Sequence, residues 1–172
     1  MRENCEKLNN QAIDLASKGQ YKEAIACFMR AITMERQNYL LWYNLGITYR
    51  DSGDLAAAKL TLEKAFRINP EDDGVIETLA IICFNMGSLN EAMNYCIIGL
   101  QFNENNYHLW NTMGVLYFNQ SCYEDASEAF EQALTINPYY YDSLYNLRDT
   151  YEELGNKAGM EECSARMAEL GM

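Results

Sequence analysis

Few side chains in this sequence are arranged as catalysis or metal binding requires. The single histidine, His108, has no cysteine or carboxylate around it at metal-ligand spacing, and the HExxH, GxxxxGK[ST] and GxSxG motifs are absent. No carboxylate pair, nucleophile or phosphate-binding loop stands out. We therefore expect no metal, no cofactor and no enzymatic activity, and we interpret His108 as a polar residue on a helix face.

The six cysteines, at positions 5, 27, 83, 96, 122 and 163, include no CxxC pair. Cys83 and Cys96 are interpreted as small buried hydrophobic residues, with a disulfide between them as the alternative. Unpaired thiols suit a reducing compartment, and the N-terminus has no apolar core of the kind found in signal peptides. The sequence therefore predicts a cytoplasmic protein.

The composition limits the class of partner. The 172 residues are 49% hydrophobic and 22% charged, as in an average globular protein, and their formal net charge is −12. Such a charge repels nucleic-acid backbones and anionic membrane surfaces, and no apolar run is long enough to span a bilayer. We expect a basic or neutral partner, no nucleic acid and no integral membrane association.

The elements that position any site are organised as an internal repeat. The only prolines, Pro70 and Pro138, both follow Ile-Asn and stand 68 residues apart, which is twice 34. Residues 1–4 then form a short N-terminal extension, and five units follow without insertion, the last of them two residues short. The predicted units are 5–38, 39–72, 73–106, 107–140 and 141–172.

Each unit carries two clusters of apolar residues at helical spacing. In the first cluster they recur at i, i+3, i+4 and i+7, and in the second at i, i+4 and i+7, so each unit is predicted to be two amphipathic helices. Trp42 and Trp110, at equivalent positions, are expected to pack the two helices of their units together. The first clusters of units two and four are Trp42, Leu45, Gly46 and Tyr49, and Trp110, Met113, Gly114 and Tyr117.

Glycine and other small residues mark two further features of the unit. One position between the helices favours a left-handed backbone and should end the first helix; it is occupied by Gly19, Gly53, Gly87, Ser121 and Gly155. Small residues also recur where the two helices must approach closely. They are Ala12, Gly46, Ala80 and Gly114 on the first helices and Ala24, Ala58, Ala92 and Ala126 on the second.

These residues resemble the tetratricopeptide repeat family, whose pattern is W-x2-L-G-x2-Y, a later A-x3-F-x2-A and a terminal P. The resemblance covers residues 5–172 and implies an all-α fold, a right-handed α-solenoid of five helix-turn-helix repeats. Unit five departs from the pattern, with Arg148 where a small residue is expected, and is interpreted as a divergent cap. A pentatricopeptide array is disfavoured because its period is 35 and its surface should be basic.

In this family a second stripe on each first helix lines a concave groove. Here the middle of that stripe is apolar, neutral amides and hydroxyls lie along it, and carboxylates outnumber the lone Arg50. The predicted partner-binding residues are Leu40, Tyr43, Asn44, Ile47, Arg50, Glu77, Thr78, Ile81, Phe84, His108, Asn111, Thr112, Val115, Phe118, Tyr145, Asn146 and Asp149.

The chemistry of this stripe suits a peptide or amphipathic helix that is apolar with basic flanks. We therefore predict a non-catalytic scaffold or adaptor for a protein partner. One alternative is a homo-oligomerisation module, such as a homodimer, built on the same apolar groove. Another is the binding of a small apolar ligand or lipid. The sequence does not identify the partner.

Overall fold

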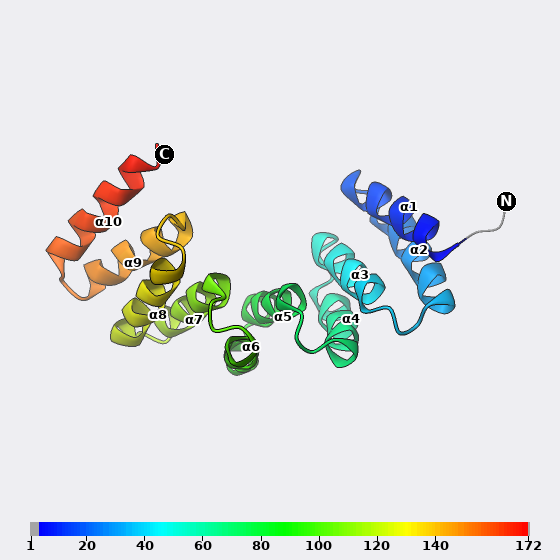
Figure 1. Ribbon diagram of the computed structural model, residues 1–172, viewed down its shortest axis with the longest axis horizontal. Coiled ribbons are helices and arrows are strands. Elements are labelled where there is room, and N and C mark those ends of the chain that lie inside the picture. The colour runs from blue at the N-terminus through cyan, green and yellow to red at the C-terminus, as the bar shows by residue number, and fades with distance from the viewer. Residues whose placement is uncertain (1–3, 172) are drawn as a thin grey trace. The chain divides into compact units, whose positions relative to one another are not determined.

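The computed structural model describes residues 4–171, and ten α-helices follow one another within them (Figure 1). The first helices of the five repeats begin at residues 5, 39, 73, 107 and 141, each 34 residues after the last. The predicted all-helical fold of helix-turn-helix repeats is confirmed. The helices are α1 (Cys5–Ser17), α2 (Tyr21–Met34), α3 (Tyr39–Asp51), α4 (Leu55–Ile68), α5 (Asp73–Asn85), α6 (Leu89–Phe102), α7 (Tyr107–Asn119), α8 (Tyr123–Ile136), α9 (Tyr141–Glu153) and α10 (Lys157–Glu169).

The helices fall into two compact halves, which are called unit 1 and unit 2 from here on and are larger than the 34-residue repeats. Unit 1, Met1–Ser88, contains α1 to α5, and unit 2, Leu89–Met172, contains α6 to α10. Within each unit, consecutive helices pack as antiparallel neighbours, as in the α3–α4 and α7–α8 pairs of Figure 1. One continuous array over residues 5–172 stays a prediction. No helix in the described chain is long and apolar enough to cross a membrane.

The predicted left-handed position ends every first helix. The φ angles of Gly19, Gly53, Gly87 and Gly155 lie between 68° and 88°, and that of Ser121 is 59°. The helices α1, α3, α5, α7 and α9 each end two residues before these positions. An L-residue rarely adopts this conformation because its Cβ approaches the following carbonyl oxygen, so Ser121 carries a strain that the four glycines avoid.

We expect Ser121→Gly to stabilise the protein by about 0.5–1 kcal/mol. The left-handed conformation costs a residue with a Cβ about 1–2 kcal/mol, and glycine's larger backbone entropy loss of about 0.5–1 kcal/mol offsets only part of that gain. Urea unfolding checks this. Gly155→Ser is the matched control: an added Cβ meets nothing within 4 Å there, so only backbone strain changes. The prediction fails if both variants shift stability in the same direction.

Close packing inside the helix pairs explains the small residues. A Cβ added to Gly46 on α3 would lie 2.5 Å from Cγ of Leu62 on α4, and one added to Gly114 on α7 would lie 2.5 Å from Cε1 of Phe130 on α8. Both distances are far below van der Waals contact, so the predicted close approach is confirmed. The alanines predicted at equivalent positions are all fully buried; they are Ala12, Ala24, Ala58, Ala80, Ala92 and Ala126.

The two tryptophans lie at the edge of the core. Both are half-buried, and Trp42 packs against the cluster of buried residues formed by α1, α2 and α3. Their ring nitrogens are also satisfied: Nε1 of Trp42 donates to the carbonyl of Arg36 at 2.8 Å, and Nε1 of Trp110 donates to that of Glu104 at 2.9 Å. Each indole therefore also stabilises, by this hydrogen bond, the turn that precedes its own helix.

No disulfide joins cysteines of the described residues, and because Cys83 lies in unit 1 and Cys96 in unit 2, the alternative of a disulfide between them stays a prediction. Both residues are fully buried, as expected for small hydrophobic side chains. Burial raises the pKa of the Cys96 thiol to about 12, which keeps it protonated at neutral pH. Cys96 therefore acts as a core residue and not as a nucleophile.

Candidate functional site

Three first helices of unit 1, α1, α3 and α5, lie next to one another and share one partly exposed face. Ile13, Leu40 and Ile81 are 46%, 49% and 43% exposed on it, which is unusual for large aliphatic side chains. Half-buried groups fill the space between them. We call this surface the unit 1 face; its residues are Asn9, Ile13, Leu40, Tyr43, Asn44, Ile47, Arg50, Glu77, Ile81 and Phe84.

Unit 2 presents a corresponding surface on α7 and α9, which are also neighbours. A hollow of about 80 Å³ lies on it, lined by Val115, Phe118, Phe130, Asn146 and Asp149. We call this surface the unit 2 face; its residues are His108, Asn111, Thr112, Val115, Phe118, Tyr145, Asn146 and Asp149. The sequence prediction thus corresponds to one face in each unit, and their union into a single groove stays a prediction.

Asparagine pairs join adjacent first helices in both units. In unit 1, Nδ2 of Asn44 on α3 donates to Oδ1 of Asn9 on α1 at 3.1 Å. In unit 2, Nδ2 of Asn146 on α9 donates to Oδ1 of Asn111 on α7 at 3.1 Å, and the buried Ser143 hydroxyl donates to the same oxygen at 2.9 Å. These amides therefore support each other as well as facing outward.

Sequence reasoning missed this pairing because it treated Asn44, Asn111 and Asn146 as separate groups for a ligand and left Asn9 out. A signal was present: each pair joins two asparagines 35 residues apart, at neighbouring positions of successive repeats. A side-chain amide has two donor hydrogens and an acceptor oxygen. After pairing, each couple still offers both a donor and an acceptor, which is what a peptide backbone needs.

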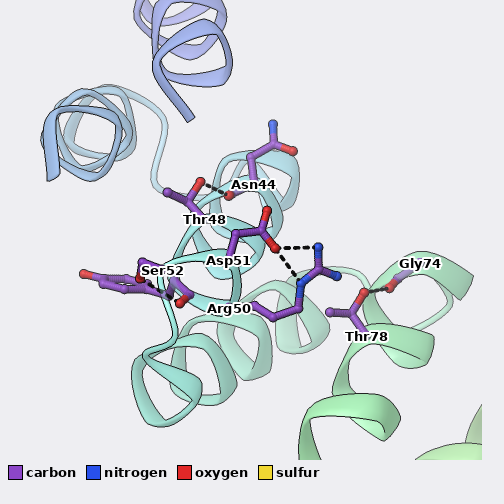
Figure 2. A network of polar contacts seen from close by, with 8 residues as sticks. Asn44, Thr48, Arg50, Asp51, Ser52, Gly74 and Thr78 are labelled. Carbon is purple, nitrogen blue, oxygen red and sulfur yellow. Dashed lines mark hydrogen bonds and ion pairs between the residues drawn. The ribbon is translucent and has the colours of Figure 1, made fainter. Parts of the chain in front are cut away.

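The hydroxyls of the two threonines predicted to face a ligand donate hydrogen bonds to backbone carbonyls of their own helices. Thr78 is only 6% exposed, and its hydroxyl donates to the carbonyl of Gly74 at 2.7 Å, as Figure 2 shows. Thr78 as a partner-binding residue stays a prediction, but its hydroxyl is committed to its own helix. Thr112, which is half-buried, makes the same contact with the carbonyl of His108 at 2.9 Å. A hydroxyl bonded to the turn before it is less available to a ligand.

Local ion pairs change the expected charges of both faces. Arg50 forms an ion pair with its neighbour Asp51, with Nη2 of Arg50 2.8 Å from Oδ1 of Asp51 (Figure 2). The lone positive charge expected on the unit 1 face is therefore compensated. On the unit 2 face Asp149 pairs with Arg148 at 2.6 Å, and the guanidinium carbon of Arg148 lies 4.5 Å from the ring centre of Tyr145. The carboxylate of Asp149 is thus compensated too.

His108 belongs to an aromatic cluster at the start of α7. Its ring centre is 4.1 Å from that of Tyr107 and 5.2 Å from that of Tyr140, and its Nδ1 lies 3.3 Å from the Tyr140 hydroxyl. That hydroxyl also contacts Oδ2 of Asp142 at 3.2 Å. The exposed imidazole therefore packs on tyrosines. Among residues 4–171, no three His, Cys, Asp or Glu side chains converge as a metal ion would require.

The sequence and the fold are similar to those of known repeat proteins. Family models described as tetratricopeptide repeat match residues 15–38, 39–72 and 108–140, which together make up more than half of the sequence. A BBSome complex member BBS4 from Bos taurus is 27% identical over 140 residues, which are 81% of this chain and 27% of that protein. The chain thus spans about a quarter of the length of that relative.

Two solved structures share the fold at low sequence identity. The crystal structure of MamA has a TM-score of 0.81 and 19% identity, and the comparison covers 91% of each chain. The structure titled YrrB, a tetratricopeptide repeat protein with an unusual peptide-binding site, has a TM-score of 0.72 and 22% identity; it covers 92% of this chain and 82% of that one. At such identities the likeness concerns the fold alone.

Proposed function

Because this chain belongs to the tetratricopeptide repeat family, we propose that it is a non-catalytic, cytoplasmic adaptor whose first-helix faces hold a peptide or amphipathic helix. Proteins of this family serve as interaction scaffolds. The finer part of the proposal is the character of the ligand: apolar along its length, with lysine or arginine beside the apolar residues.

The observation that carries this proposal is the combination found in each unit of an asparagine pair beside accessible apolar side chains. In unit 1, Ile13 and Leu40 accompany Asn9 and Asn44 on the same two helices. In unit 2 the same combination consists of Val115 and Tyr145 with Asn111 and Asn146. Buried apolar contact supplies affinity for a peptide, and amides satisfy its backbone groups.

Hollow size and net charge favour a peptide with basic flanks over a small apolar molecule. A drug-sized ligand typically occupies a pocket of about 300–1,000 Å³, whereas the hollow beside Val115 and Phe118 measures about 80 Å³, enough for one apolar group. With a net charge of −12 and Arg50 paired to Asp51, basic residues of the ligand are attracted. The printed title of the YrrB structure, with its peptide-binding site, also supports a peptide ligand.

We expect Ile81→Asp and Val115→Asp each to weaken partner capture about tenfold or more while leaving the helical content unchanged. Each substitution places a carboxylate where an apolar contact is expected, and burial of an unpaired charge is costly. The measurement is a pull-down from the source cells, quantified for the captured protein and repeated with a peptide of that protein. Circular dichroism reports the helical content.

Leu60→Asp is the matched control, because Leu60 is 63% exposed on the second helix α4 and lies outside both faces. It should capture the partner as well as the unchanged protein does. Equal losses with Leu60→Asp and Val115→Asp would contradict the proposal. Molar mass measured over a dilution series tests self-association, and a dimer broken by Ile81→Asp would replace the adaptor by a homodimer built on the same face.

A further inference from the structure

A larger hollow lies on a different side of α7, where α7 packs against α8 in unit 2. It measures about 420 Å³, and its walls are aromatic and acidic. The indole of Trp110 and the ring of Tyr117 come from α7, and the carboxylates of Asp125 and Glu128 come from α8. The full lining is Trp110, Met113, Tyr117, Asp125, Glu128, Ala129, Glu131 and Gln132.

The equivalent place in unit 1 shows what such an indole accepts. There Lys64 of α4 holds its ammonium 4.6 Å from the ring centre of Trp42, a cation–π contact within the chain. Two repeats, or 68 residues, later in the sequence, Trp110 occupies the position equivalent to Trp42, and Gln132 the position equivalent to Lys64. In the same way, Asp125 is equivalent to Ala57, and Glu128 is equivalent to Leu60. The site at Trp110 therefore has a neutral glutamine where the site at Trp42 has a lysine, and it has two carboxylates where the site at Trp42 has apolar side chains.

We propose that this hollow, which we call the Trp110 pocket, binds a lysine side chain of a protein partner. The ammonium lies against the Trp110 ring as Lys64 lies against Trp42, and its hydrogens are donated to Asp125 and Glu128. The four-carbon stem packs along Met113 and Tyr117. This pocket is separate from the unit 2 face, whose residues on α7, such as Asn111 and Val115, occupy another side of that helix.

The surrounding polar groups are consistent with this assignment. Nε1 of Trp110 is already committed to the Glu104 carbonyl, so the indole offers its ring and not its hydrogen. Glu131 accepts a hydrogen bond from the Tyr151 hydroxyl at 2.5 Å, and it is therefore tied to α9. Within the described chain, Asp125 and Glu128 have no ion-pair partner. Two carboxylates beside an aromatic ring make the pocket complementary to a cation.

The chain holds only two tryptophans, which gives the test an internal reference. In the full chain labelled with ¹⁵N, the indole N–H signals of Trp42 and Trp110 are followed while a peptide, acetyl-Gly-Lys-Gly-amide, is added at low salt. Trp42→Phe assigns the two signals. We expect the Trp110 signal to move saturably, with a dissociation constant on the order of millimolar, because exposed cation–π contacts and surface ion pairs are individually weak. The Trp42 signal should stay in place.

Three comparisons decide the outcome. The peptide with norleucine in place of lysine, which keeps the stem without the charge, should not bind. Asp125→Asn combined with Glu128→Gln should weaken the lysine peptide about tenfold. Gln132→Lys should abolish binding, because its own ammonium then occupies the Trp110 ring. The proposal is overturned if Trp110 does not respond, if both indoles respond alike, if norleucine binds as well as lysine, or if tetramethylammonium binds and lysine does not.

Discussion

Phe130→Ala is expected to lower the free energy of unfolding by about 3–5 kcal/mol, the range for removing a fully buried phenylalanine. Phe130 is 1% exposed and joins a cluster of buried residues from α8, α9 and α10 that includes Leu144, Leu147 and Met167. The ring packs closely on the α7 backbone at Gly114, so its removal leaves a cavity there. Urea unfolding followed by circular dichroism measures the loss.

Phe102→Ala is the control for that experiment, because Phe102 also lies in unit 2 but is 50% exposed near the end of α6. Its loss should stay within about 0.5 kcal/mol, as for most surface substitutions. If the two variants lose similar amounts of stability, Phe130 is not the core residue that the structure indicates.

Gly114→Leu is the second large effect, with an expected loss of about 1–3 kcal/mol or more from overpacking. The added side chain points at the ring of Phe130, and even its Cβ would stand 2.5 Å from Cε1. The α7–α8 pair would have to separate, which would also disturb Trp110 and the hollow beside it. Thermal unfolding in parallel with the unchanged protein measures this loss.

The first helix pair provides a graded control for the same site. Ala12 and Phe28 occupy there the positions of Gly114 and Phe130, and both are buried. The fold therefore accommodates one methyl group opposite a phenylalanine. Gly114→Ala should cost much less than Gly114→Leu, since alanine also favours a helix over glycine by about 1 kcal/mol. A loss for Gly114→Ala as large as that for Gly114→Leu would contradict this expectation, because it would mean that the Phe130 ring cannot shift to admit even one methyl group.

Much of the fold was predictable because its signals are local. The repeat spacing placed every first helix, and the glycine position predicted where those helices end, including the exceptional Ser121 at φ 59°. Helix periodicity also located the close approach at Gly46 and Gly114. These features depend on residues within one repeat, and they recur at each repeat.

The candidate site was predicted less well, because the exposure and the bonding partners of its side chains depend on contacts that helical periodicity does not predict. Helical spacing puts Thr78 on the same stripe as Ile81, yet Thr78 is buried and bonded to Gly74 whereas Ile81 is 43% exposed. From its position on the stripe, Arg50 was expected to present an uncompensated positive charge. It instead pairs with Asp51, which helical periodicity places on another side of the helix. A long side chain can reach a neighbour that the stripe does not include.

Taken alone, the sequence determined that this protein is an array of paired helices with a definite register, because burial along a helix repeats every 3.6 residues and leaves a readable pattern. Only the tertiary structure decided how successive repeats join: that Asn9 bonds to Asn44 and Asn111 to Asn146, and that α8 sets Asp125 and Glu128 beside Trp110. The physical reason is that hydrogen bonds and charge pairs between repeats depend on distances of a few ångströms between separate helices. Those distances are fixed when the helices pack, and residue spacing along a single helix does not contain them.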